Sequence, residues 1–235
     1  MSTVGACMVI CNANYAVQLC IESARKYHPN LPLYIGVTLS QDGAREYAQP
    51  LADYFYEEYT THGRMLDHLC KQVKEDYILI MDSDVEFTTN CIDKMVKELE
   101  DNDAFCVCRT PRSPVAVVNW DGVVTTGMAR IDPSCALFRK DQLLRILNVF
   151  SFTNYITKFG PCYFYDTAAM VSEAARLLGF KVVERDWIWD DCIHFGGISF
   201  IPQDGTIDKT DPATAMRLKQ YDVIQKHLKR LRASK

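Results

Sequence analysis

Apolar runs and amphipathic stretches alternate along the first hundred residues. Two of the runs, residues 4–11 and 77–81, are apolar throughout and show no alternation with polar side chains. Such runs are typical of strands that are covered on both faces, as the strands of parallel sheets are. The stretches between the runs place apolar side chains at helical spacing. The alternation therefore predicts an α/β fold, in which crossover helices flank a parallel sheet.

The expected elements of the first half are strands at residues 4–11, 33–37, 53–59 and 77–82, and helices at residues 15–27 and 64–74. Beyond residue 104 the order is looser, with strands near residues 104–109, 115–118, 134–138 and 181–184, a strand end turning into a loop at 193–197, and helices at residues 142–149, 167–178 and 213–232. The last helix carries one apolar stripe formed by Leu218, Tyr221, Ile224, Leu228 and Leu231.

Composition narrows the class of protein. A chain of 235 residues with 48% hydrophobic content can bury the core of one large domain, and no linker divides it. A net charge of −4 argues against a nucleic-acid binder that neutralises phosphates over a broad surface. The ten cysteines include no Cys-x-x-Cys pair, and neither a membrane span nor a signal peptide is evident. We expect a soluble, cytoplasmic protein in a reducing compartment, which for a viral protein means the host cytoplasm.

The apolar run at residues 77–81 ends directly in Asp82-Ser83-Asp84. Carboxylates at the carboxyl end of such a strand fall in the crevice where α/β folds bind their ligands. Hard oxygen ligands at close spacing suit Mg²⁺ or Mn²⁺, which usually share their coordination with a substrate phosphate. A second pair, at Asp101 and Asp103, follows a charged helix rather than an apolar strand, so we expect it in a solvated loop. The first pair predicts a metal site for a nucleotide-linked substrate.

Taken in order, these features resemble a nucleotide-sugar-dependent glycosyltransferase of the GT-A fold with a DxD motif. The likeness spans nearly the whole chain, and its motifs are the strand that ends in Asp82-Ser83-Asp84, the segment Pro133 to Arg139, Tyr165-Asp166-Thr167 before a helix, Gly179-Phe180-Lys181-Val182, and a late His194. The chain is also similar to the stand-alone glycosyltransferase domains encoded by large algal DNA viruses, and its compact size looks like bacterial or viral members.

The resemblance implies a Rossmann-like fold with a mixed, mainly parallel central sheet in a single domain, residues 1–235. Its parts would be a nucleotide-sugar-binding half at 1–103, an acceptor half at 104–210 and a C-terminal helix at 211–235. It also implies an enzyme of the hexosyltransferase type, with a UDP-sugar as donor and a hydroxyl of a glycan or glycoprotein as acceptor. Asp82, Asp84 and His194 would hold the cofactor, Mn²⁺ or Mg²⁺, although a lone histidine in an apolar strand is often a hydrogen-bonded core residue.

Three acids are candidates for the catalytic base that takes the proton of the acceptor hydroxyl: Asp166, Asp190 and Asp191. Asp166 is also suited to cap the following helix, and the other two to form a turn. The choice among them, and with it a retaining or inverting outcome, stays open. Trp120 and Trp189 are candidate stacking platforms for an acceptor sugar.

The nucleotide is expected at the ends of the first two strands and on the helix before the DxD strand. The candidate residues for binding the donor are Cys11, Asn12, Thr38, Arg64, Asp67, Asp82, Ser83, Gly196 and Gly197. The two glycines are included because backbone without side chains can approach a pyrophosphate closely.

Other classes of protein share parts of this pattern. A haloacid dehalogenase-type phosphatase also has a strand that runs into Asp-x-Asp, but it expects threonine where this chain has Glu86. A sugar-phosphate nucleotidyltransferase usually begins with a glycine-rich, basic loop, whereas residues 4–15 contain one glycine and no lysine or arginine. A non-catalytic sugar or nucleotide binder would keep the pocket and tolerate the loss of Asp84.

Overall fold

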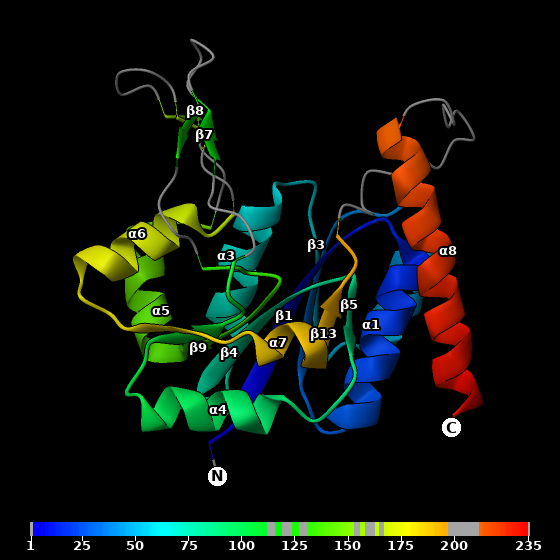
Figure 1. Cartoon of the computed structure of the whole chain (residues 1–235), viewed down its shortest axis with the longest axis horizontal. Coiled ribbons are helices and arrows are strands. Elements are labelled where there is room, and N and C mark those ends of the chain that lie inside the picture. The colour runs from blue at the N-terminus through cyan, green and yellow to red at the C-terminus, as the bar shows by residue number, and fades with distance from the viewer. Residues whose placement is uncertain are drawn as a thin grey trace.

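A seven-stranded sheet forms the centre of the molecule in the computed structural model, with helices on both faces (Figure 1). The structure describes residues 2–111, 116–118, 124–126, 131–152, 156–157, 163–164, 167–196 and 212–234. The strand order is β12-β6-β9-β4-β1-β2-β3. The bounds are β1 Val4–Cys11, β2 Leu33–Leu39, β3 Tyr54–Glu57, β4 Tyr77–Asp82, β6 Cys106–Cys108, β9 Cys135–Arg139 and β12 Val182–Glu184.

Only β9 runs against its neighbours in this sheet. It pairs antiparallel with β4 on one side and β6 on the other, while the remaining pairs are parallel. The carboxyl ends of β1, β2, β4 and β6 therefore meet at one edge of the sheet, together with the amino end of β9. The expected mixed, mainly parallel sheet is confirmed, and this edge is where an α/β fold binds its ligands.

Smaller antiparallel pairs join β5 (Val85–Phe87) to β13 (Cys192–His194), β7 (Ala116–Val118) to β8 (Val124–Thr126), and β10 (Ile156–Thr157) to β11 (Tyr163–Phe164). Sequence reasoning missed β5, because three residues after a turn are too few to show a pattern. This omission matters because β13, which ends at His194, pairs with β5.

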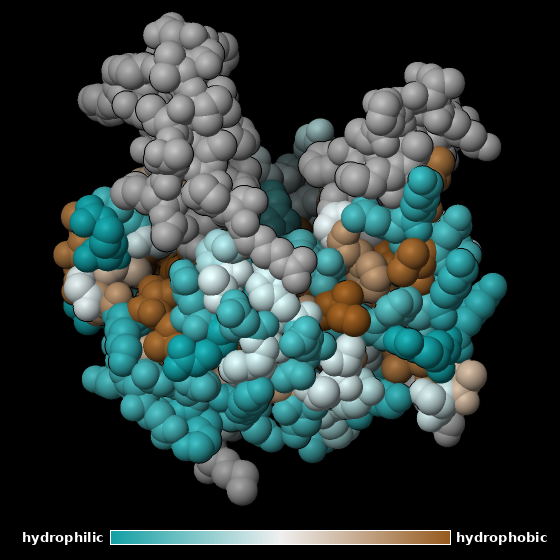
Figure 2. All heavy atoms as spheres, in the orientation of Figure 1, coloured by the Kyte–Doolittle hydropathy of each residue, from teal (hydrophilic) through white to brown (hydrophobic). Residues whose placement is uncertain are grey.

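Six of the helices cover the two faces of the central sheet, and each turns buried apolar side chains toward it. The helices are α1 Asn14–Tyr27, α2 Ala44–Ala48, α3 His62–Gln72, α4 Ile92–Asp101, α5 Lys140–Leu147, α6 Ala169–Leu177, α7 Trp187–Asp191 and α8 Pro212–Ala233, with one 3-10 turn at Gln49–Leu51. Buried side chains of α1, α2 and α4 share one core with the sheet, and those of α3, α5 and α6 share the other. The face of the molecule over α4 is mostly hydrophilic (Figure 2).

Helix α3 lies unusually close to the sheet at Gly36. A Cβ atom at this position of β2 would overlap the side chain of Met65, and it would also press on Leu69. The glycine thus lets α3 approach β2 and sets the position of the first turn of α3, which begins beside the ligand-binding edge. Thr61 caps this helix by accepting a hydrogen bond from the backbone N–H of Arg64.

The C-terminal helix α8 packs on α1, with Ile224, Leu228 and Leu231 buried against Ala16 and Leu19. The stripe expected from the sequence is confirmed at these positions. A buried carboxylate on β5 also anchors the helix, because Nδ1 of His227 lies 2.6 Å from Oε2 of Glu86. Helix α8 therefore braces the strand pair β5 and β13 from outside the central sheet.

Candidate active site at the carboxyl end of β4

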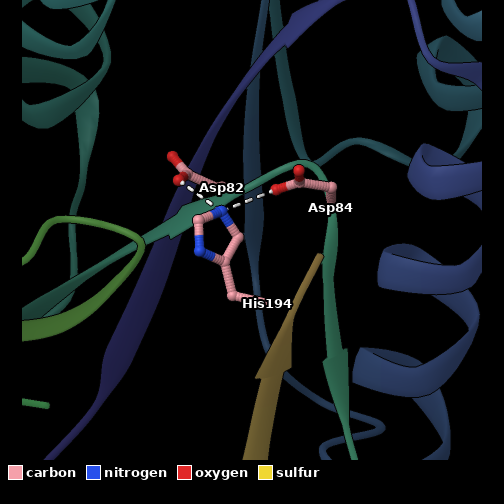
Figure 3. Close-up of side chains that lie close together, drawn as sticks. All are labelled: Asp82, Asp84 and His194. Carbon is pink, nitrogen blue, oxygen red and sulfur yellow. Dashed lines mark ion pairs between the residues drawn. The ribbon is translucent and has the colours of Figure 1, made fainter. Parts of the chain in front are cut away.

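Three metal-ligating side chains converge where β4 ends. Asp82 is the last residue of β4, Asp84 follows in the turn, and His194 ends β13 directly opposite Val85 of β5. The Nε2 atom of His194 lies 3.2 Å from Oδ2 of Asp82 and 3.1 Å from Oδ1 of Asp84 (Figure 3). Residues more than a hundred positions apart in the sequence thus meet because β13 pairs with β5.

The two carboxylates differ in exposure. The Asp84 side chain is 9% exposed and that of Asp82 27%. Burial, the largest single influence, opposes ionisation of Asp82, but the hydrogen bond with His194 and the positive charges nearby together outweigh it and lower the pKa of Asp82 to about 2. Asp82 is therefore an anion at neutral pH. A site of this kind attracts a cation.

The arrangement fits a divalent metal ion. One donor atom from each of Asp82, Asp84 and His194 lies within 4.8 Å of the others. Adjacent ligands of an octahedral ion with bonds of about 2.1 Å are roughly 3 Å apart, which matches the two distances to Nε2. Two carboxylates and an imidazole form a donor set that suits Mn²⁺ and Mg²⁺. Among the described residues this is the one cluster of three such groups.

Buried Arg109 hydrogen-bonds to His194 through Nδ1, the ring nitrogen that does not face the two carboxylates. Nη2 of Arg109, just after β6, donates to Nδ1 of His194 at 2.7 Å, and Nε and Nη2 both donate to the carboxylate of Asp132, just before β9. The ring of Trp189 stacks on the guanidinium at 3.9 Å. Arginine has only donors, so Nδ1 accepts and Nε2 carries the proton that faces the carboxylates. A metal ion held by Nε2 and the two carboxylates would take the place of that proton.

Sequence reasoning missed Arg109 and Asp132. Both were visible as charged residues beside predicted strands, at residues 104–109 and 134–138. The missing information was the direction of β9, which brings its amino end to the same edge as the carboxyl end of β6.

A cavity of about 260 Å³ opens beside the cluster. Its lining consists of His62, Asp82, Arg109, Asp132, Pro133, Ser134, Thr167 and His194. Burial opposes ionisation of Asp132, but the hydrogen bonds from Arg109 and Ser134 outweigh burial and lower its pKa. The cavity thus presents an anionic carboxylate close to the metal-ligand cluster. His62, the first residue of α3, also lies in this lining.

A second cavity, of about 480 Å³, lies over the ends of β1 and β2. It is lined by Cys11, Thr38, Leu39, Tyr59, Thr60, Thr61 and Arg64. Three residues expected to bind the nucleotide, Cys11, Thr38 and Arg64, are therefore brought together. Asn12 lies next to them with a positive φ of 58°, and its side chain accepts a hydrogen bond from the backbone N–H of Gln41.

Three other residues expected to bind the donor, Asp67, Ser83 and Gly196, are not among those that line this second cavity. The carboxylate of Asp67 accepts hydrogen bonds from the hydroxyl of Ser151 and, at 2.9 Å, from the backbone N–H of Phe152, so it ties α3 to the segment after α5. Ser83 is buried in the turn between Asp82 and Asp84. Gly196 has a φ of 66°, a value that favours glycine, and it follows His194 closely.

Two of the acids considered as catalytic base lie in the described residues. Asp190 and Asp191 belong to helix α7 and not to a turn, the alternative considered for them, and a carboxylate oxygen of Asp191 is 3.7 Å from Nζ of Lys94. Neither acid is among the residues that line the 260 Å³ cavity. Asp166, Gly197 and Trp120 lie outside the described residues.

Comparison with known proteins identifies a family that the chain matches and solved structures that share its fold. The family model of glycosyl transferase family 2 matches residues 6–164, about two thirds of the chain. No curated protein matches the chain in sequence. Among the described residues, no helix has the length and apolar content needed to span a membrane.

Two solved structures match this chain at low sequence identity. A mannosyltransferase from Pyrobaculum calidifontis in complex with GDP-Man and Mn²⁺ matches with a TM-score of 0.55 and 15% identity, over 78% of this chain and 55% of that enzyme. TarS of S. aureus in complex with UDP matches with a TM-score of 0.47 and 14% identity, over 61% and 48%. The chain thus spans about half the length of these enzymes.

Proposed function

This chain belongs to glycosyl transferase family 2, and from that premise we propose that it moves a sugar from a nucleoside-diphosphate sugar to a hydroxyl group of a glycan or glycoprotein. The observation that carries the proposal is the convergence of Asp82, Asp84 and His194 at the carboxyl end of β4, with one cavity beside this cluster and a second over the ends of β1 and β2. The donor in this proposal is a UDP-sugar, and the cofactor is Mn²⁺ or Mg²⁺.

The cavity over β1 and β2 is the proposed nucleotide site. Its floor is made by Cys11, Thr38 and Leu39 at the ends of the two strands, and Arg64 supplies a positive charge at its side. Cavities at this edge of parallel sheets are suited to a base and ribose, because strand ends present backbone groups and small side chains there. Asn12 shapes the end of β1 and Gly196 the turn after β13, with Ser83, Asp67 and Gly197 as further proposed contacts of the donor.

Transfer breaks the bond between the anomeric carbon and the β-phosphate, so negative charge grows on the leaving diphosphate. A divalent ion supplies the stabilisation of that charge when it is bound. Asp84 and His194 would hold the ion. Asp82 would hold the ion directly or through a bound water, or would bind the ribose hydroxyls. Arg109 keeps the ring of His194 in place from the opposite side, which fixes where Nε2 points.

An acid on the acceptor side must take the proton of the attacking hydroxyl. We propose Asp166 for this role, on the resemblance of Tyr165-Asp166-Thr167 to the family's pattern. Thr167, its neighbour, lines the cavity beside the metal-ligand cluster and supports that position. Asp190 and Asp191 are the alternatives. They are the weaker candidates because both lie on α7 outside the lining of that cavity, and Asp191 is close to Lys94.

The family match favours this reaction over phosphatase or nucleotidyltransferase chemistry. The test is to incubate the protein with Mn²⁺ and a panel of UDP- and GDP-sugars and to measure free nucleoside diphosphate, with simple phosphate esters and Mg²⁺ in parallel. We expect diphosphate release that depends on the metal ion. Release of inorganic phosphate from the esters, with every nucleotide sugar intact, would instead support a phosphatase.

A further inference from the structure

We propose that helix α8 positions the metal-ligand cluster, and that Gln220 and His227 on this helix raise the affinity for the divalent ion by holding the end of β13 in place. Neither residue belongs to the cluster itself. This inference rests on the proposed function, because it assumes that Asp82, Asp84 and His194 bind a metal ion. It goes further by assigning a role in metal binding to a helix that lies outside the central sheet.

His194 ends a strand that has little support of its own. Strand β13 has three residues and pairs with β5 alone, in a sheet of two strands apart from the central sheet. Isolated pairs of two strands are at best marginally stable in water. Two residues beyond His194, the backbone at Gly196 has a φ of 66°, so the extended chain ends there. The position of His194 therefore depends on contacts from outside this pair of strands.

The residue after His194 connects the cluster to α8. The backbone N–H of Phe195 donates to the carbonyl oxygen of Asp84 at 3.1 Å. The carbonyl oxygen of Phe195 accepts a hydrogen bond from Nε2 of Gln220 at 2.6 Å. Its ring packs edge to face on the ring of His227, with the two centroids 5.4 Å apart. Phe195 is thus joined to His194 by the chain, to Asp84 by its N–H, and to α8 by its carbonyl and its ring.

The same helix also holds the partner strand β5. Nδ1 of His227 lies 2.6 Å from Oε2 of Glu86, and Nη2 of Arg230 lies 3.7 Å from Oε1 of the same carboxylate. The Glu86 side chain is 5% exposed, and a buried carboxylate is costly without such partners. Glu86 lies opposite Ile193, the neighbour of His194 in the chain. Helix α8 therefore contacts both strands of the pair, within two residues of a metal ligand on each.

The position of α8 does not depend on these contacts alone. Its apolar stripe is buried against α1, and Nη2 of Arg232 donates at 2.6 Å to the carboxylate of Glu22 on α1. Helix α1 in turn packs on the central sheet (Figure 1). The loss of one side-chain contact with β13 should therefore loosen that strand and leave α8 docked.

The test measures the affinity for Mn²⁺ by electron paramagnetic resonance in the wild type, Gln220→Met and Gln225→Met. Methionine has about the length of glutamine but cannot donate a hydrogen bond. Gln225 is the matched control, because it lies on the same helix about 140° around the axis from Gln220 and, in the part of the chain that the structure describes, forms no hydrogen bond with Phe195. We expect Gln220→Met to weaken Mn²⁺ binding by about three- to tenfold, the range for one hydrogen bond, and Gln225→Met to leave it within about twofold.

Two further readouts separate the positioning of His194 from general stability. Electron spin echo envelope modulation detects the nitrogen of an imidazole bound to Mn²⁺, and this signal should weaken in Gln220→Met and stay unchanged in Gln225→Met. In a His194→Ala background, Gln220→Met should change the Mn²⁺ affinity by less than about twofold, because the ligand that it positions is absent. Equal losses in the two backgrounds would overturn the inference, and so would an unchanged affinity in Gln220→Met alone.

Hydrogen exchange of the wild type gives an independent answer, should the variant not fold. Coupling between two parts of a protein is reciprocal, so Mn²⁺ should slow exchange of the backbone amides at residues 218–228 relative to those of α5. Equal exchange at 218–228 with and without bound ion would refute the inference. Failure of the wild type to bind Mn²⁺ would contradict the proposed function itself, and this inference with it.

Discussion

At the scale of single residues, Asp82 and Asp84 have different surroundings although they are two positions apart. Asp84 is nearly buried and faces Nε2 of His194, while Asp82 also borders the cavity. The other pair with the same spacing lies in solvent, and the side chain of Asp103 is 99% exposed. The apolar strand before Asp82 was therefore the informative signal, and the spacing alone was not.

We expect Asp84→Asn to lower the affinity for Mn²⁺ by more than about a hundredfold, because it removes the charge of a proposed ligand and not only a group that orients one. Equilibrium titration of Mn²⁺ by electron paramagnetic resonance measures the effect. Asp103→Asn makes the same chemical change in the solvent-exposed pair and should bind Mn²⁺ like the wild type. Equal affinities for both variants would remove Asp84 from the metal site.

Asp132 should also make stability depend on pH. The pKa of its carboxyl is lowered in the folded protein, because hydrogen bonds from Arg109 and Ser134 outweigh its burial. The folded carboxyl thus binds its proton more weakly than the unfolded one, so its stabilisation is present above about pH 4 and is lost as the pH falls below that value. The melting temperature of the wild type should approach that of Asp132→Asn as the pH falls below about 4. A constant difference on both sides of this pH would contradict the assignment.

At the scale of elements, long apolar runs were predicted well from the sequence, and short strands were not. The bounds of β1 match the expected residues 4–11, and the helices α1, α3 and α8 appear within a few residues of their expected ends. The pair β5 and β13 positions His194, yet each strand has three residues and no readable period. The pairing of His194 with Val85 is a long-range contact that local pattern could not reveal.

The close packing of α3 on β2 gives a prediction for Gly36→Ala. The added methyl group must displace Met65, so we expect a loss of about 1–3 kcal/mol in the free energy of unfolding. Chemical denaturation of Gly36→Ala, Met65→Ala and the double variant measures the coupling between the two positions. The double variant should lose less than the sum of the single variants. Additive losses would show that the two side chains do not compete for the same space.

At the scale of the whole molecule, the site is a product of the sheet topology. Strand ends from β1, β2, β4 and β6 and the start of β9 lie at one edge, while α8 braces β5 and β13 through Glu86 and His227. The sequence predicted the parallel part of this arrangement from the alternation of strands and helices. It did not predict the reversed direction of β9, which brings Asp132 to Arg109.

Because the site is assembled by the sheet, removing metal should not unfold the protein. We expect the far-ultraviolet circular dichroism spectrum to stay unchanged in EDTA. The melting temperature should rise with added Mn²⁺, because an ion that binds only the folded state stabilises it. Asp84→Asn should show no such rise. Unfolding in EDTA would instead indicate a structural metal.

The central claim is that Asp82, Asp84 and His194 bind one divalent cation. Anomalous diffraction at the manganese absorption edge, from crystals grown with Mn²⁺ and UDP, tests it most directly. The account predicts a single strong peak within bonding distance of the two carboxylates and of Nε2 of His194. A crystal with bound UDP and no peak between these three side chains, or with the ion held elsewhere, would contradict it.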